Sequence, residues 1–201
     1  MVEAVVWDIG NVFAIWDPVS YYERRLGAEG CARFFTESGI EAVNVELDLG
    51  APARETLEAH AARNPGWADE IRLWFDDWEE MFRAPVPGMV ELFEEVKATG
   101  VRMLALSNFG RETFEIAKAM HPVLTGFDEP YVSAHLSCVK PDPTINAALE
   151  DGSGLSGHAL IFVDDKAENI AAAKVRGWKG HVFDGADGWR ARLGAEGILP
   201  R

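Results

Sequence analysis

One stretch near the N-terminus decides the fold, and it reads VVWDIGNV at residues 5–12. Its first three residues are apolar and suit a buried strand, whereas Gly10 and Asn11 tolerate the tight backbone that follows a strand. Asp8 therefore stands at the C-terminal end of a strand, where open α/β sheets bind their ligands. An aspartate after a strand more commonly caps a turn or a helix, so Asp8 alone does not define a site.

A second apolar run, ALIFV at residues 159–163, also ends in carboxylates, those of Asp164 and Asp165. Adjacent carboxylates repel each other unless a cation or a donor offsets their charge. If both strands deliver carboxylates to one edge of a sheet, Asp8 and this pair could hold Mg²⁺ and leave one carboxylate as a nucleophile. Asp165 could instead cap the next helix, an explanation that suits one of the pair better than both.

Two further stretches carry groups suited to an anion. Ser107 and Asn108 follow an apolar strand, where a hydroxyl and free backbone N–H groups can cradle an anion. Lys140 lies between a strand and a helix in CVKPDP at residues 138–143. The two prolines stiffen this segment and keep a helix from starting before Pro143, so Lys140 can aim a fixed charge at a phosphoryl group. The ordinary alternative for Ser107 or Asn108 is to cap the following helix. The ordinary alternative for Lys140 is a solvated position in a loop.

Strands and helices alternate over most of the chain, which predicts an α/β fold with a three-layer, Rossmann-like parallel sheet. The expected strands lie at 4–8, 101–107, 131–133, 160–164 and 179–183, and the expected helices at 89–99, 111–120, 144–150 and 167–176.

Residues 15–87 break the alternation with helical patterns at 18–26, 28–38, 51–62 and 68–82 and no clear strand. We expect a helical cap at 15–87, inserted after the first strand of a core made of 1–14 and 88–201. Such a cap bears on substrate choice, because loops at this sheet edge carry function. Trp74, Trp78 and Phe82 recur at helical spacing and are expected in the core of the cap, with a sugar-stacking face as the alternative.

The composition indicates which kinds of partner and which cellular location to expect. The chain has 201 residues and a net charge of −14, which argues against nucleic acid and anionic membranes as partners. Cys31 and Cys138 predict neither a disulfide framework nor a zinc site, and none of the five histidines has metal-ligand spacing. The N-terminus has no basic, apolar leader pattern, so a cytoplasmic location is expected. The sequence leaves the oligomeric state open.

Taken in order, the four stretches resemble the haloacid dehalogenase-like superfamily, in its phosphatase branch with a helical cap. The resemblance implies a Mg²⁺-dependent enzyme acting on a small phosphorylated metabolite, in which Asp8 attacks phosphorus and forms an aspartyl phosphate. It implies that Ser107 and the Asn108 backbone bind the phosphoryl oxygens and that Lys140 offsets the negative charge that gathers on them. Asp165 is then the more direct metal ligand, and Asp164 binds the metal itself or through water. The Gly10 backbone carbonyl is the last ligand that the protein provides.

Gly10 departs from the pattern, because most phosphatases of this superfamily have an aspartate two residues after the nucleophile. That aspartate protonates the leaving group and later activates water. Its loss typically costs about two to four orders of magnitude in rate unless another group substitutes. Asp17 could substitute, because it follows the first motif closely, but an Asp-Pro turn that starts the first cap helix is the commoner role for such a residue.

Three branches of the superfamily have another residue at the position of Gly10, and each implies a different reaction or substrate. Phosphonate hydrolysis needs a cap lysine, yet no lysine precedes Lys97. 2-Haloacid dehalogenation needs no leaving-group acid, but it does not require magnesium and usually has small hydroxyl residues where this chain has Asp164 and Asp165. DIGNV at residues 8–12 is similar to a bacterial phosphatase branch that includes a glucose-1-phosphate phosphatase, which favours a sugar phosphate such as a sugar 1-phosphate. A phosphate-binding or regulatory protein with low turnover is the non-enzymatic alternative.

Overall fold

The computed structural model describes residues 1–200, and its centre is a five-stranded parallel sheet of order β5-β4-β1-β6-β7. The strands are β1 (Ala4–Trp7), β4 (Arg102–Ser107), β5 (Glu129–Val132), β6 (Leu160–Asp164) and β7 (Lys179–Val182). Val6 of β1 is in register with Leu104 on one side and Phe162 on the other. The strand ends that precede Asp8, Asn108 and Asp165 therefore meet at one edge, and the predicted α/β fold is confirmed.

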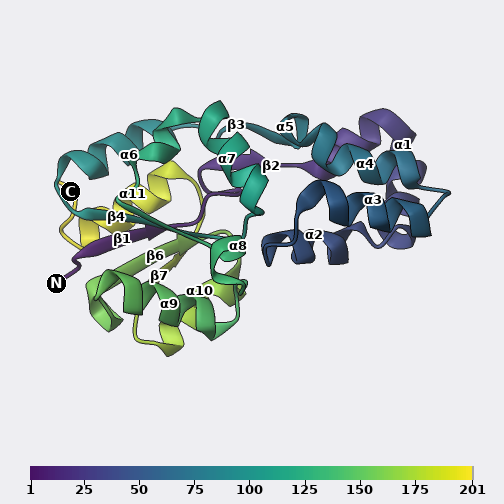
Figure 1. The fold of residues 1–201 in the computed structure, drawn as a ribbon. Helices are drawn as coiled ribbons and strands as arrows, with labels where there is room; N and C mark the ends of the chain where they lie inside the picture. Colours follow the sequence, from purple (N-terminus) through teal and green to yellow (C-terminus); the bar gives the residue numbers. More distant parts are fainter. Residues whose placement is uncertain (201) are drawn as a thin grey trace.

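Helices cover both faces of the sheet, as near-continuous apolar strands require (Figure 1). One face carries α6 (Met89–Ala98), α7 (Arg111–Met120) and α11 (Ala186–Ala195), and the other carries α9 (Pro143–Ser153) and α10 (Ala167–Val175). On the first face, the Trp7 ring meets Phe93 and Trp189 edge-on at centroid distances of 5.6 and 5.7 Å. A short helix, α8 (Ser133–Leu136), follows β5.

The inserted cap lies beyond the C-terminal ends of the strands (Figure 1). Its helices are α1 (Pro18–Glu37), α2 (Ile40–Asp48), α3 (Ala53–Arg63), α4 (Ala68–Asp76) and α5 (Trp78–Met81). Within α1, Gly27 has a φ of 73° and breaks the helix, as the two expected segments imply. Buried aromatic rings form the cap's core, where Tyr22 stacks on Phe34 at 4.2 Å.

The expectation that residues 15–87 contain no strand is wrong. β2 (Ala14–Trp16) and β3 (Phe82–Pro85) pair antiparallel and join the cap to the core. Both are too short to show an alternating pattern, and Phe82 had been expected at the end of a helix. Helix α2 was not expected either, although the apolar spacing of Ile40, Val43 and Leu47 fits one buried helix face.

None of the helices in residues 1–200 is both long and apolar enough to cross a membrane. Cys31 and Cys138 are free thiols.

Candidate active site

The four predicted stretches meet in a pocket of about 330 Å³ between the core and the cap. The core contributes charged and polar groups at the strand ends: Asp8, Gly10, Asn11, Ser107, Asn108, Lys140, Asp165, Lys166 and Asn169. The cap and its connecting ribbon contribute a largely apolar wall together with Asn44 and Asp48. Residues from distant parts of the sequence therefore share one cavity, as strands ending at one edge predict.

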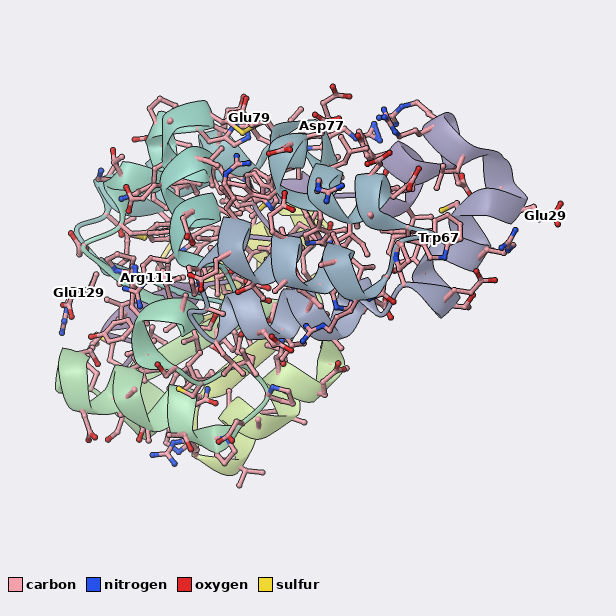
Figure 2. All side chains as sticks on the ribbon, turned by 45° about the vertical axis from the view of Figure 1, so that its right-hand side comes forward. Glu29, Trp67, Asp77, Glu79, Arg111 and Glu129 are labelled. Carbon is pink, nitrogen blue, oxygen red and sulfur yellow. The ribbon has the colours of Figure 1, made fainter. Side chains whose placement is uncertain are left out.

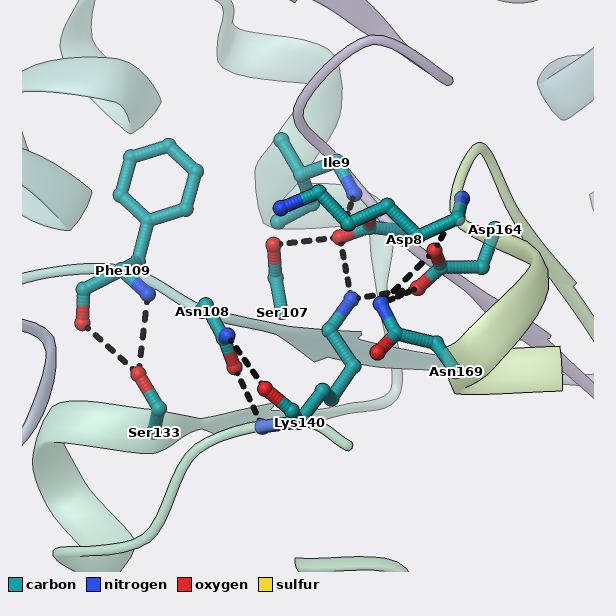
Figure 3. A network of polar contacts seen from close by, with 10 residues as sticks. Asp8, Ile9, Ser107, Asn108, Phe109, Ser133, Lys140, Asp164 and Asn169 are labelled. Atoms are coloured by element: carbon teal, nitrogen blue, oxygen red, sulfur yellow. Dashed lines mark hydrogen bonds and ion pairs between the residues drawn. The ribbon is translucent and has the colours of Figure 1, made fainter. Parts of the chain in front are cut away.

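Asp8 is buried, and three donors converge on its Oδ1 atom (Figure 3). These donors are the Ile9 backbone N–H at 2.7 Å, the Ser107 hydroxyl at 2.7 Å and the Lys140 ammonium at 2.8 Å. Among the described residues no hydrogen bond is made to Oδ2. One oxygen is thus held in place, and the other is left for a reacting group or a cation.

Lys140 bridges the two buried carboxylates of the site. Its Nζ atom lies 2.8 Å from Asp8 and 2.7 Å from Asp164. The Asn108 side chain fixes the Lys140 backbone, because it accepts from the Lys140 N–H at 2.8 Å and donates to the Lys140 carbonyl at 3.1 Å. Burial opposes the charged lysine, yet both carboxylates outweigh it and raise the pKa of Lys140. As predicted, the following helix α9 starts at Pro143.

Asp164 and Asp165 have different environments. Both Asp164 oxygens are engaged, by Lys140 at 2.7 Å, by the Asn169 amide at 2.8 and 3.0 Å, and by the Lys166 N–H at 2.8 Å. Asp165 lines the pocket and is only partly buried. Its pKa is raised by burial and by the charge of Asp164. Asp165 therefore has the freer carboxylate, and Asp164 is held mainly by its donors.

The site fits a hard divalent cation. Carboxylate oxygens of Asp8, Asp164 and Asp165 all lie within 4.8 Å of one another. Burial and the nearby Asp164 raise the pKa of Asp8, although Lys140 and Ser107 act in the opposite direction. A bound cation would offset this crowding of negative charge, and an all-oxygen donor set is the kind that Mg²⁺ prefers.

The structure places Asp17 outside this pocket. Its carboxylate caps α1, accepting from the Ser20 N–H at 3.0 Å, and pairs with Arg83 at 2.8 Å. Burial alone would raise the pKa of Asp17, but these donors outweigh it and lower that pKa. A low pKa and two committed oxygens suit a helix cap rather than an acid, so we do not assign the missing proton transfer to Asp17.

Asp48 is a pocket residue that the sequence interpretation missed. It ends α2, an unexpected helix, and accepts from the Asn44 amide at 3.1 Å. Burial raises the pKa of Asp48 to about 7 against the opposing charges of Lys166 and Lys140. Neither its neighbours in sequence nor its spacing from Asp8 resembles a motif, so only the packing of the cap reveals it.

Aromatic rings form the apolar wall of the pocket. Trp74, Trp78 and Phe82 are buried in the cap's core, as expected, yet all three also line the cavity. The other aromatic lining residues are Trp16, Phe75 and Phe109. By contrast, Trp67 lies at the far end of the cap (Figure 2), and no histidine lines the pocket. The wall offers contact area to an apolar or planar group more than hydrogen bonds.

An aspartate-centred, cation-suited pocket between a parallel-sheet core and an inserted helical cap defines a capped α/β hydrolase. Residues 2–177 match the family of haloacid dehalogenase-like hydrolases, and the chain belongs to that family.

Three relatives illustrate its range. The chain is 33% identical over 189 residues to the sesquiterpene phosphatase astK of Aspergillus oryzae, covering 90% of each. A HAD family enzyme of Bacteroides thetaiotaomicron, in complex with magnesium and inorganic phosphate, superposes with a TM-score of 0.73 at 15% identity, over 96% of this chain and 100% of that one. L-2-haloacid dehalogenase of Xanthobacter autotrophicus, with chloropropionic acid covalently bound, superposes with a TM-score of 0.62 at 18% identity. The superposition covers 100% of this chain and 85% of that one. The two structures support the shared fold.

Proposed function

We propose that this protein is a Mg²⁺-dependent phosphatase that hydrolyses small phosphomonoesters through a covalent aspartyl phosphate on Asp8. The observation that carries the proposal is the asymmetry of the Asp8 carboxylate. Its Oδ1 holds three donors, while Oδ2 is free in a pocket that also contains Lys140 and Asp165. The sesquiterpene phosphatase relative supports the same reaction class.

In the first step, Asp8 Oδ2 attacks phosphorus, a P–O bond to the carboxylate forms, and the bond to the substrate oxygen breaks. Ser107 and the N–H groups after β4 are placed to bind phosphoryl oxygens, and the Lys140 ammonium offsets the charge that gathers there. Water then attacks the aspartyl phosphate and restores Asp8. When held by Asp165 and the Gly10 carbonyl beside Asp8, Mg²⁺ would supply further charge neutralisation at the phosphoryl group.

The apolar wall supports an organic phosphate with a hydrophobic body. Trp16, Phe75 and Phe109 line the cavity, and so do Val45 and Leu47 of α2. Burial of a hydrocarbon group contributes about 0.8 kcal/mol per CH₂, so such a wall favours an alkyl or terpenyl phosphate. The name of the curated relative, a sesquiterpene phosphatase, points to the same substrate class.

A sugar 1-phosphate is the second candidate, and one feature of the wall favours it. Trp16 stacks against Trp78 at a centroid distance of 5.6 Å, both residues line the cavity, and flat aromatic rings are a common contact surface for sugar rings. The leaving group of a sugar 1-phosphate is a hemiacetal hydroxyl, which departs more easily than an ordinary alcohol. Hydrolysis of such a substrate would therefore need a strong acid less.

The test is phosphate release from a panel of alkyl, terpenyl and sugar phosphates, with Mg²⁺ and with EDTA. We expect metal-dependent release and the highest kcat/KM for the apolar members. The panel includes 2-chloropropionate without metal, since chloride release there would establish dehalogenation instead. Absence of phosphate release from every member would overturn the proposed function.

A further inference from the structure

We propose that Asp48, delivered by cap helix α2, is the catalytic acid that protonates the leaving-group oxygen in place of the carboxyl missing at Gly10. The inference rests on the proposed phosphatase function and adds a residue to it. Asp48 lines the pocket that holds Asp8, yet it lies outside the carboxylate cluster suited to the metal.

A hydrogen-bonded chain orients the Asp48 carboxyl. Trp74 donates its indole N–H to Asn44 Oδ1 at 2.9 Å, which fixes the orientation of the Asn44 amide. The amide nitrogen of Asn44 then donates to Asp48 Oδ2 at 3.1 Å. Among the described residues no hydrogen bond engages Oδ1 of Asp48, so that oxygen is available to carry a proton into the pocket.

Contacts between cap and core hold the end of α2 in place. Gly50, two residues after Asp48, has a φ of 104°, and a Cβ there would lie only 2.6 Å from the Ala134 carbonyl oxygen of α8. Close to this contact, the Ala53 N–H donates to Glu112 of α7 at 3.1 Å. Backbone packing this close fixes the end of α2, and with it the place of Asp48 in the pocket wall.

The electrostatic surroundings suit an acid at neutral pH. Four influences act on Asp48: burial and Asp8 favour its neutral form, whereas Lys166 and Lys140 favour its charged form. The balance leaves the pKa of Asp48 at about 7, so a large fraction of the carboxyl carries a proton near neutrality. A solvated aspartate, with a pKa near 4, would be almost fully ionised under those conditions.

The proposed step balances in atoms and charge. As the phosphorus–oxygen bond breaks, the Asp48 proton passes to the departing oxygen, and the alcohol leaves neutral. The resulting Asp48 carboxylate then accepts a proton from the water that attacks the phosphorus of the aspartyl phosphate. The acid is restored at the end of each cycle.

Gly10 offers a gain-of-function control. A Cβ at this position would meet only the Trp16 Cβ, at 4.0 Å, so the backbone surroundings of Gly10 leave room for a side chain to begin there. Gly10→Asp would place a carboxyl where most phosphatases of this superfamily carry theirs. If Asp48 is the acid, this second carboxyl can replace it.

The experiment compares wild type, Asp48→Asn, Asp48→Asn/Gly10→Asp and the matched control Glu46→Gln, an exposed carboxylate on the same helix. Each is assayed with an alkyl phosphate, whose leaving group needs a proton, and with p-nitrophenyl phosphate, whose leaving group does not. We expect Asp48→Asn to lose about 10²–10³-fold in kcat on the alkyl phosphate and less than about fivefold on the nitrophenyl ester. BeF₃⁻ binding with Mg²⁺, followed by ¹⁹F NMR, should persist in Asp48→Asn, and the double variant should regain alkyl phosphatase activity.

Equal losses on both substrates, or an unchanged alkyl phosphatase rate, would overturn the role of Asp48 while the phosphatase function stands. Loss of BeF₃⁻ binding in Asp48→Asn would show a structural role and would also overturn it. A wild-type enzyme that releases phosphate from neither substrate would refute the phosphatase function itself.

Discussion

The Lys140 ammonium lies 2.8 Å from Oδ1 of Asp8, a contact that joins the end of the first strand to the proline-flanked segment before α9. The same nitrogen lies 2.7 Å from Asp164, so a single buried cation serves two buried carboxylates. Such an arrangement is costly to desolvate and is retained where the fixed charge has a use. For the proposed phosphatase, that use is compensation of the negative charge at a phosphoryl group.

Removal of Lys140 should therefore affect both stability and catalysis. Lys140→Ala leaves two buried carboxylates uncompensated, and we expect a loss of about 3 kcal/mol in the free energy of unfolding and at least about 10²-fold in kcat. Urea denaturation and phosphate release measure the two effects. Lys174→Ala, at an exposed lysine, is the matched control. Full activity of Lys140→Ala would rule out this role.

The two adjacent aspartates should separate by phenotype. Asp165 has the freer carboxylate, so Asp165→Asn should raise the Mg²⁺ concentration for half-maximal activity by about 10–100-fold with little change in Tm. Asp164→Asn disturbs the donors from Lys140 and Asn169 and should lower Tm clearly. Magnesium titrations and thermal melts provide both numbers. The reverse pattern would exchange the assigned roles.

The pH dependence follows from the Asp48 carboxyl, which must be protonated to act as the acid. Its pKa of about 7 in the free protein predicts that kcat/KM for an alkyl phosphate falls as the pH rises above that value. Asp48→Asn should lack this descending limb of the pH profile.

The stability of the fold should also depend on the ionisation of Asp48. Because the pKa of Asp48 is raised in the folded state, its ionisation weakens the fold as the pH rises from about 4 through 7. Asp48→Asn should therefore gain more in Tm at pH 8 than at pH 5, and an equal change at both would contradict the environment described for Asp48.

The aromatic wall should set selectivity by chain length. Across butyl, hexyl and octyl phosphate, kcat/KM should rise about fourfold per added CH₂ until the pocket is filled. Phe75→Ala, at a partly buried lining residue, should flatten this series, and Phe75→Leu should largely preserve it. A series without dependence on length, alongside efficient hydrolysis of a sugar 1-phosphate, would favour the second candidate substrate.

The sequence predicted the core and its strand-end residues well, because apolar runs ending in polar groups are local signals. Asp8, Ser107, Lys140 and Asp165 were all expected at one edge, and the pocket contains all of them. Asp17 illustrates the limit of such reasoning, since proximity in sequence to Asp8 did not translate into proximity to the pocket.

Asp48 could not be found by the same means. Its place over the site depends on how a glycine after α2 packs against the Ala134 carbonyl, a contact between segments far apart in the sequence. The short ribbon of β2 and β3 was missed for a different reason, because three or four residues are too few to establish a period.

Identification of the covalent intermediate tests most directly whether Asp8 is the nucleophile. Wild-type enzyme is mixed with Mg²⁺ and a phosphate ester that it hydrolyses, quenched in acid within the first turnover and mapped by peptide mass spectrometry. We expect a phosphoryl group on the peptide that contains Asp8, bound through an acyl linkage that hydroxylamine cleaves, and none in Asp8→Asn. Turnover by Asp8→Asn at the wild-type rate, or a phosphoryl group on another residue, would contradict it.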